Sequence, residues 1–86
     1  MKDKKMVVVK WVDSHEALGW TPISELGPCD SKECTTVGIL IDKNHSAVMV
    51  AGSTAHDPEQ SCGTMFIPRE NILSINELKQ FKPIEF

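Results

Sequence analysis

Two short apolar runs at the centre of this 86-residue chain constrain its fold more than any other feature. Residues 35–42 (TTVGILID) and 46–51 (SAVMVA) are separated only by Lys43-Asn44-His45. β-Branched residues favour strands, and Asp and Asn favour the tight turn between two of them. The pattern therefore predicts a β-hairpin. A glycine inside the first run, Gly38, predicts a bulge or a sharp bend in that strand.

A further strand is predicted near the N-terminus, over residues 6–13 (MVVVKWVD). Three consecutive valines disfavour a helix, because a β-branched side chain loses χ1 freedom there. Alternation along the strand places Val7, Val9 and Trp11 on one side. The following residues, 14–34, contain glycines and prolines and few apolar positions in register. They predict a loop with one short turn or strand near residues 20–26.

The C-terminal half predicts two more strands. Residues 52–63 are almost entirely polar and predict a long exposed loop, after which residues 64–68 and 70–75 return to a strand pattern. Asn76 could cap one short helical turn. Five short strands with intervening turns favour an all-β fold, a small antiparallel barrel in a single domain, 1–86, with its core over about 6–78 and a tail over 79–86. A split sheet with one helix is the alternative.

Composition narrows the class of function. A formal net charge of -3 disfavours a protein that holds long nucleic acid by neutralising its phosphates. No apolar run is long enough to cross a bilayer, so no membrane partner is expected. The first five residues lead directly into the valines without a signal-like segment, and three cysteines cannot all pair with one another. A cytoplasmic protein with reduced thiols is the natural expectation.

Neither catalysis nor a cofactor is expected. The sequence contains no nucleophile motif such as GxSxG, no HExxH and no glycine-rich phosphate loop. Zinc bound by Cys29, Cys34, His56 and Cys62 is a weaker alternative, because the four-residue gap between the first two is looser than the usual CxxC knuckle. Buried free cysteines behave as small apolar residues, and this explains each one without a metal.

A recognition surface is the better candidate. Aromatic side chains can stack on a base, hydroxyl groups can contact a polar edge, and arginine is well suited to an oxyanion. Trp11 in a strand also suits the core, Trp20 suits either role, and Arg69 suits a surface salt bridge equally well. The residues predicted to bind a ligand are Trp11, Asp13, Ser14, Trp20, Ser53, Thr54, His56 and Arg69.

The order of these segments carries a resemblance. A first strand, a loop, a bent hairpin, a further strand and then IPxxxIxxIxxL over residues 67–78 resemble the SH3-like and Sm-like small barrels. More narrowly, WVDS at residues 11–14, Gly19-Trp20, and VGIL at residues 37–40 resemble small uncharacterised proteins encoded by phages and prophages. That likeness transfers no active site, and it implies the cytoplasm of a bacterial host.

These features together predict a non-catalytic phage-type protein that binds and withholds a small anionic ligand. A nucleotide second messenger of bacterial immunity, such as a cyclic nucleotide, is the ligand class expected by analogy. A module that binds a host or phage protein is the alternative, and an Sm-like oligonucleotide binder is the third. The tail, with Phe81, Ile84 and Phe86, also favours a homo-oligomer, in which ligand sites would lie at subunit boundaries.

Overall fold

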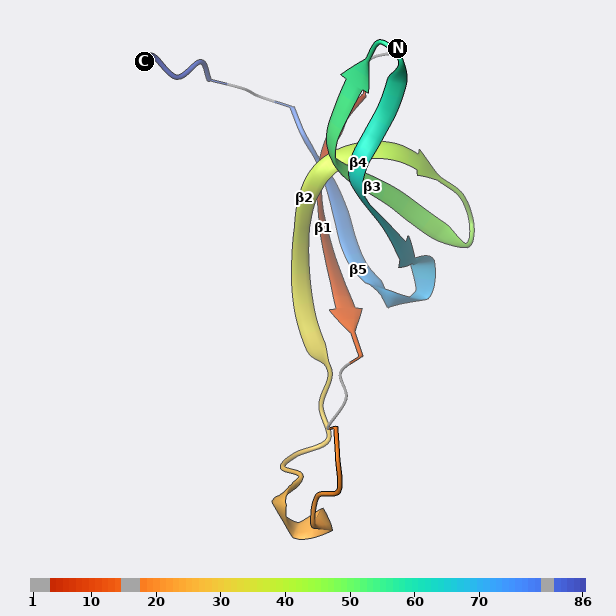
Figure 1. The fold of residues 1–86 in the computed structure, drawn as a ribbon, viewed down its shortest axis with the longest axis vertical. Coiled ribbons are helices and arrows are strands. Elements are labelled where there is room, and N and C mark those ends of the chain that lie inside the picture. The colour runs from red at the N-terminus through yellow and green to blue at the C-terminus, as the bar shows by residue number, and fades with distance from the viewer. Residues whose placement is uncertain (1–3, 15–17, 80–81) are drawn as a thin grey trace.

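The computed structural model describes residues 4–14, 18–79 and 82–86, and these form one antiparallel sheet (Figure 1). The prediction of an all-β fold with five antiparallel strands is confirmed. The strand order across the sheet is β4-β3-β2-β1-β5. The elements are β1 (Met6–Asp13), the 3-10 turn η1 (Ile23–Glu25), β2 (Lys32–Lys43), β3 (Ala47–His56), β4 (Glu59–Pro68), the 3-10 turn η2 (Arg69–Asn71) and β5 (Ile72–Leu78).

The sheet is not closed into a barrel, so the expected closure is wrong. β4 and β5 form its two edges, and each is hydrogen-bonded to one neighbour only, β3 and β1 respectively. The turn η2 separates β4 from β5 and redirects the chain, so that β5 pairs antiparallel with β1 instead of with β4. Strand spacing in a sequence indicates the number of strands, whereas closure depends on how far the sheet curls.

β2 bends sharply and is shared between two partners. Its first part, up to Ile39, pairs with β1, and its last part, from Ile39 onward, pairs with β3. A Cβ atom on Gly38 would lie 2.6 Å from the carbonyl oxygen of Ala51 and 2.7 Å from Cγ1 of Val50. The register shifts between Leu40 and Asp42. The bulge or sharp bend predicted at Gly38 is not found at that residue: the pairing with β1 runs regularly through Gly38, and the register shift lies between Leu40 and Asp42. Gly38 instead marks a close approach of β3.

The turn between β2 and β3 forms as predicted. The Asn44 side-chain oxygen Oδ1 accepts hydrogen bonds from the backbone N–H groups of Ser46 (2.8 Å) and Ala47 (2.9 Å). The backbone N–H of Asn44 donates to the carbonyl oxygen of Ala47 at 3.0 Å. This local arrangement satisfies the backbone N–H groups of Asn44, Ser46 and Ala47 within the turn itself.

The hydrophobic core is small. Trp11, Leu40 and Ile72 are partly buried and pack against it, as the alternation predicted along β1 requires. Val9 is completely buried. The buried apolar side chains come from three strands, and they are Val7 and Val9 of β1, Val48, Val50 and Ala51 of β3, and Ile67 of β4.

The predicted loop over residues 52–63 is wrong. β3 continues to His56 and β4 begins at Glu59, so that the two strands form a second hairpin around a turn at Asp57 and Pro58. In its register Ser53 lies opposite Cys62. Most side chains here are exposed on both faces, so the sequence lacks the alternation that marks a half-buried strand. Backbone pairing alone forms this part of the ladder.

The predicted helical turn after Asn76 is also wrong. Asn76, Glu77 and Leu78 belong to β5 and lie opposite Val8, Val7 and Met6 of β1. Pairing with β1 therefore overrides the local capping preference of Asn76. The turn that does form, η2, lies earlier, directly after Pro68. Of the predicted tail over residues 79–86, the described residues 79 and 82–86 have no regular structure, whereas residues 80 and 81, and with them Phe81, lie outside the described residues.

Residues 18–31, here called the extension, project from the sheet between β1 and β2 (Figure 1, orange). The short turn predicted near residues 20–26 is confirmed as η1. Positive φ angles of 87° at Gly19 and 75° at Gly27 allow the chain to reverse on either side of η1. Among the described residues, no helix is long and apolar enough to span a membrane.

Candidate ligand-binding site

A pocket of about 270 Å³ lies between the β2–β3 turn and β5, on the side where the sheet stays open. We call it the cationic pocket. It brings together the end of β2, the start of β3, η2 and the first half of β5. Its lining residues are Lys43, Val48, Arg69, Ile72, Leu73, Ser74 and Ile75.

The lining combines positive charge with apolar surface. Among the described residues, Lys43 and Arg69 are its ionisable residues, and no carboxylate lines it. Val48 belongs to the core and Ile72 packs against that core, so the apolar part of the pocket is backed by the best-packed region of the protein. A ligand with one anionic end and one flat or apolar end matches this distribution.

The hairpin turn holds Arg69 in place. Its backbone N–H donates to the carbonyl oxygen of Ser46 at 2.9 Å, and its guanidinium Nη1 donates to the carbonyl oxygen of Asn44 at 3.3 Å. A guanidinium has five N–H donors, so most remain available to an oxyanion. Within the described part of the chain, neither Arg69 nor Lys43 forms a salt bridge. The two charges are therefore not neutralised by a carboxylate in that part of the chain.

Of the eight residues predicted to bind a ligand, Arg69 alone lines this pocket. Ser53, Thr54 and His56 lie on the far half of β3. At about 3.3 Å per residue, the six residues from Val48 to Thr54 span roughly 20 Å. These hydroxyl groups therefore cannot share a small ligand with Arg69 of the same chain.

Of the remaining four predicted residues, Trp11 and Asp13 lie on β1, Ser14 directly follows it, and Trp20 lies on the extension. Trp11 is partly buried against the core, and its indole Nε1 donates to Oγ1 of Thr36 at 2.9 Å, which supports the core alternative for this residue. Asp13 ends β1 and Ser14 follows it, exposed. Trp20 lies on the extension and is fully exposed.

Sequence reasoning missed Lys43. It was assigned to the turn, and nothing in its local sequence distinguishes it from a solvated lysine. The signal that could have found it is structural: β5 pairs with β1 and so brings Ile72 and Ile75 to the end of the β2–β3 hairpin.

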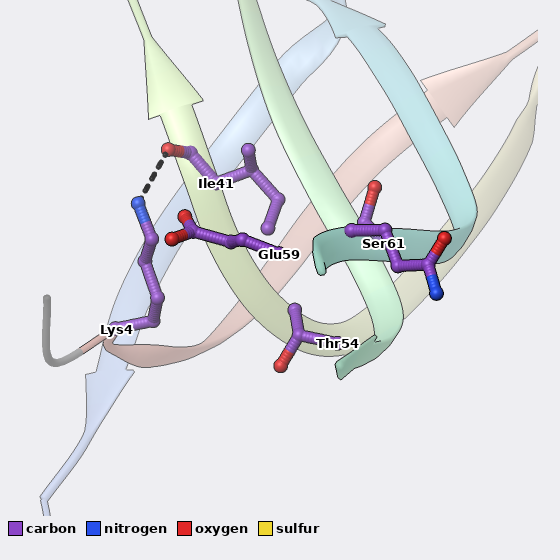
Figure 2. Close-up of a pocket in the computed structure, with 6 residues that line it drawn as sticks. Lys4, Ile41, Thr54, Glu59 and Ser61 are labelled. Atoms are coloured by element: carbon purple, nitrogen blue, oxygen red, sulfur yellow. Dashed lines mark hydrogen bonds between the residues drawn. The ribbon is translucent and has the colours of Figure 1, made fainter. Parts of the chain in front are cut away.

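A second pocket, of about 200 Å³, lies beside the β3–β4 hairpin (Figure 2). It contains Thr54, one of the predicted residues, and Lys4, whose Nζ donates to the carbonyl oxygen of Ile41 at 3.4 Å. Figure 2 shows the carboxylate of Glu59 directed toward the ammonium group of Lys4. A carboxylate in the lining repels an anionic ligand, so this pocket is the poorer candidate.

The residues of the zinc alternative are not brought together. Cys29 lies exposed on the extension, Cys34 lies opposite Trp11 in β2, and Cys62 lies opposite Ser53 in β4. Among the described residues, which include all three cysteines and His56, no group of three or more His, Cys, Asp or Glu side chains could hold a metal ion.

No protein-family model, no curated protein and no solved structure matches this chain. The resemblance to SH3-like and Sm-like barrels and to phage proteins therefore stays a prediction from the sequence motifs.

Proposed function

We propose that this chain is a non-catalytic binding protein that captures a small anionic ligand in the cationic pocket. The observation that carries the proposal is that the described lining holds Lys43 and Arg69, without a carboxylate, beside the apolar side chains of Ile72, Leu73 and Ile75. Arg69 is oriented by its bond to Asn44 before any ligand arrives, which reduces the entropy lost on binding.

A nucleotide is the ligand class that fits best. Its phosphate would accept hydrogen bonds from the guanidinium of Arg69 and the ammonium of Lys43, and its base would lie on Val48 and Ile72. Within the described part of the chain, the lining includes no histidine, cysteine or carboxylate that could act as general base, which supports capture rather than turnover.

In this proposal the protein is of the phage type and acts in the bacterial cytoplasm, where it withholds a nucleotide second messenger of immunity. What supports an SH3-like or Sm-like assignment is the five-stranded antiparallel sheet with a register shift in its second strand, between Leu40 and Asp42. A module that binds a host or phage protein is the second candidate, and the exposed apolar side chains of the extension favour it.

Titration calorimetry with ADP-ribose, cyclic di-AMP and cyclic tri-adenylate tests the proposal. At least one of them should bind, and Arg69→Ala and Lys43→Ala should each weaken that binding about 10- to 100-fold, because a hydrogen bond to a charged group contributes about 1.5–3 kcal/mol. Lys10→Ala is the matched control, since it removes the same charge from an exposed position on β1 outside the pocket. Absence of binding by all three ligands, or equal losses in Lys10→Ala and Arg69→Ala, would overturn the proposal.

A further inference from the structure

The chain exposes far more surface than a compact monomer of its size. Its accessible surface is 7470 Å². A folded monomer of 9.6 kDa is expected to expose about 5100 Å². The radius of gyration is 17.2 Å, against roughly 12 Å for a compact domain of this length. The excess of about 2400 Å² is more than one partner contributes to a standard interface, about 800 Å².

Much of the exposed apolar surface lies on the extension. Leu18 and Ile23 are 84% and 88% exposed, Trp20 is fully exposed, and Leu26 is more than half exposed. Exposed apolar residues that stand singly need no explanation, but four on one short segment mark a contact surface. Tryptophan is also among the residues that contribute most to protein interfaces.

The charged side chains on and beside the extension indicate which kind of surface packs against it. Carboxylates lie on it and beside it, at Asp13, Glu25 and Glu33, while Lys32 lies opposite Asp13 in the β1–β2 register. Two extensions packed on each other would bring like charges together, and an anionic lipid surface would repel them. A partner with an apolar pocket and a positively charged rim is complementary.

The chain itself carries such a pocket. The cationic pocket combines Lys43 and Arg69 with Ile72, Leu73 and Ile75. Leu73 is 57% exposed, so apolar surface is available at its rim. In Figure 1 the extension lies at one end of the longest axis, whereas the β2–β3 turn and η2 lie beside the middle of the molecule. Extension and pocket of the same chain are therefore apart, and their contact requires two copies.

We propose that copies of this chain assemble head to tail, the extension of one covering the cationic pocket of the next. Trp20 then lies over the apolar part of the neighbour's cationic pocket, and an anionic ligand competes with the carboxylates of the extension for Lys43 and Arg69. This competition rests on the proposed function, whereas the assembly does not. The contact joins two different surfaces, so it repeats from copy to copy and gives a ring or a filament. The contact also brings Trp20 of one copy close to Arg69 of the next, although the two residues lie far apart within one chain.

Sedimentation of the ligand-free protein under reducing conditions tests the assembly. The parent protein should associate with rising concentration, and Trp20→Ala and Glu25→Lys should each raise the dissociation constant at least 10-fold. Phe66→Ala is the control, because Phe66 is 65% exposed but belongs to β4, outside both surfaces. A monomer at all concentrations, or equal weakening by Phe66→Ala, would overturn the inference.

Photo-crosslinking tests the location of the contact. A Trp20→p-benzoylphenylalanine variant is irradiated in a mixture of chains of natural and heavy isotopic composition, and the joined peptides are identified by mass spectrometry. Crosslinks between chains to residues 43–48 or 69–75 are expected. Crosslinks elsewhere or only within one chain would overturn the inference.

Measurements of ligand binding distinguish a failure of the proposed assembly from a failure of the proposed function. Trp20→Ala should bind ADP-ribose or cyclic di-AMP more tightly than the parent protein, because the extension no longer competes for the pocket, whereas Arg69→Ala should bind either ligand poorly. A monomer that binds either ligand would contradict the assembly alone. An assembly that binds neither of them nor cyclic tri-adenylate would contradict the proposed function alone.

Discussion

Replacement of Gly38 by alanine is the most direct test of the bend that shapes the sheet. A Cβ atom there would lie 2.6 Å from the carbonyl oxygen of Ala51 and 2.7 Å from Cγ1 of Val50. The oxygen belongs to the backbone of β3, so a side-chain rotation cannot relieve the contact. β2 and β3 would have to separate at the place where Val50 and Ala51 enter the core.

The expected cost is a substantial part of the stability. Extra atoms forced into a packed region destabilise by about 1–3 kcal/mol, and the backbone contact places Gly38→Ala at the upper end. A domain of 86 residues has a free energy of unfolding of about 4–13 kcal/mol. Each kcal/mol lowers the Tm of so small a domain by about 4–8 °C, so a decrease of roughly 10–20 °C is expected.

Denaturant titration followed by tryptophan fluorescence measures the effect, with Gly52→Ala as the matched control. Gly52 is also a strand glycine, but the nearest atom to its added Cβ is the Cys62 carbonyl oxygen at 3.7 Å, an ordinary contact. Gly52→Ala should be neutral or stabilise by up to about 1 kcal/mol. Equal stability of Gly38→Ala and the parent, or equal losses in both variants, would refute the close approach of β3 at Gly38.

Four further results are expected. Trp11→Phe should lower the free energy of unfolding by about 1 kcal/mol, because the hydrogen bond to Thr36 is lost. The double variant Trp11→Phe/Thr36→Val should be no less stable than Trp11→Phe alone, and a further loss would contradict that hydrogen bond. Asn44→Ala should cost about 1 kcal/mol, because two backbone N–H groups lose their acceptor, and unchanged chemical denaturation would contradict the turn. Trp20→Ala should change the thermal stability of dilute protein by less than about 0.5 kcal/mol, since the side chain is fully exposed, and a larger loss would place it in the core. Ligand affinity measured by calorimetry should fall as salt rises, because Arg69 and Lys43 act through charge, and a salt-independent affinity would argue against them.

The parts of the fold that local sequence could predict are those with a local cause. The β2–β3 turn has an asparagine that satisfies two backbone N–H groups, and β1 alternates between buried valines and outward residues. Both were predicted correctly. A bulge or bend was predicted at Gly38, but the register shift lies between Leu40 and Asp42, and Gly38 marks a close approach of β3 instead.

The errors have a common cause in pairing between distant segments. The β3–β4 hairpin has few buried side chains beyond Ala51, so its polar residues resembled a loop, yet backbone pairing extends it to His56. Asn76 to Leu78 form a strand because β1 offers them an edge. In both cases a short stretch of sequence does not contain the distant strand with which it pairs.

The candidate site was predictable only in its chemistry. Arginine was chosen as an oxyanion donor, and Arg69 does line the cationic pocket. Its partner Lys43 lies 26 positions earlier and meets it because β4 pairs with β3, which places Pro68 opposite Ala47 at the end of the β2–β3 turn. Trp20 and Ser53 are held on other parts of the chain, and no spacing rule shows this in advance.

Native mass spectrometry of the protein as purified from bacteria, without chelator, tests the central claim most directly. Capture in the cationic pocket predicts a defined species carrying the mass of one nucleotide-sized ligand per site, and this mass should be lost in Arg69→Ala and retained in Lys10→Ala. A bare species that stays bare after addition of ADP-ribose, cyclic di-AMP and cyclic tri-adenylate would contradict the claim. A mass increment that persists in Arg69→Ala would place the ligand elsewhere on the molecule.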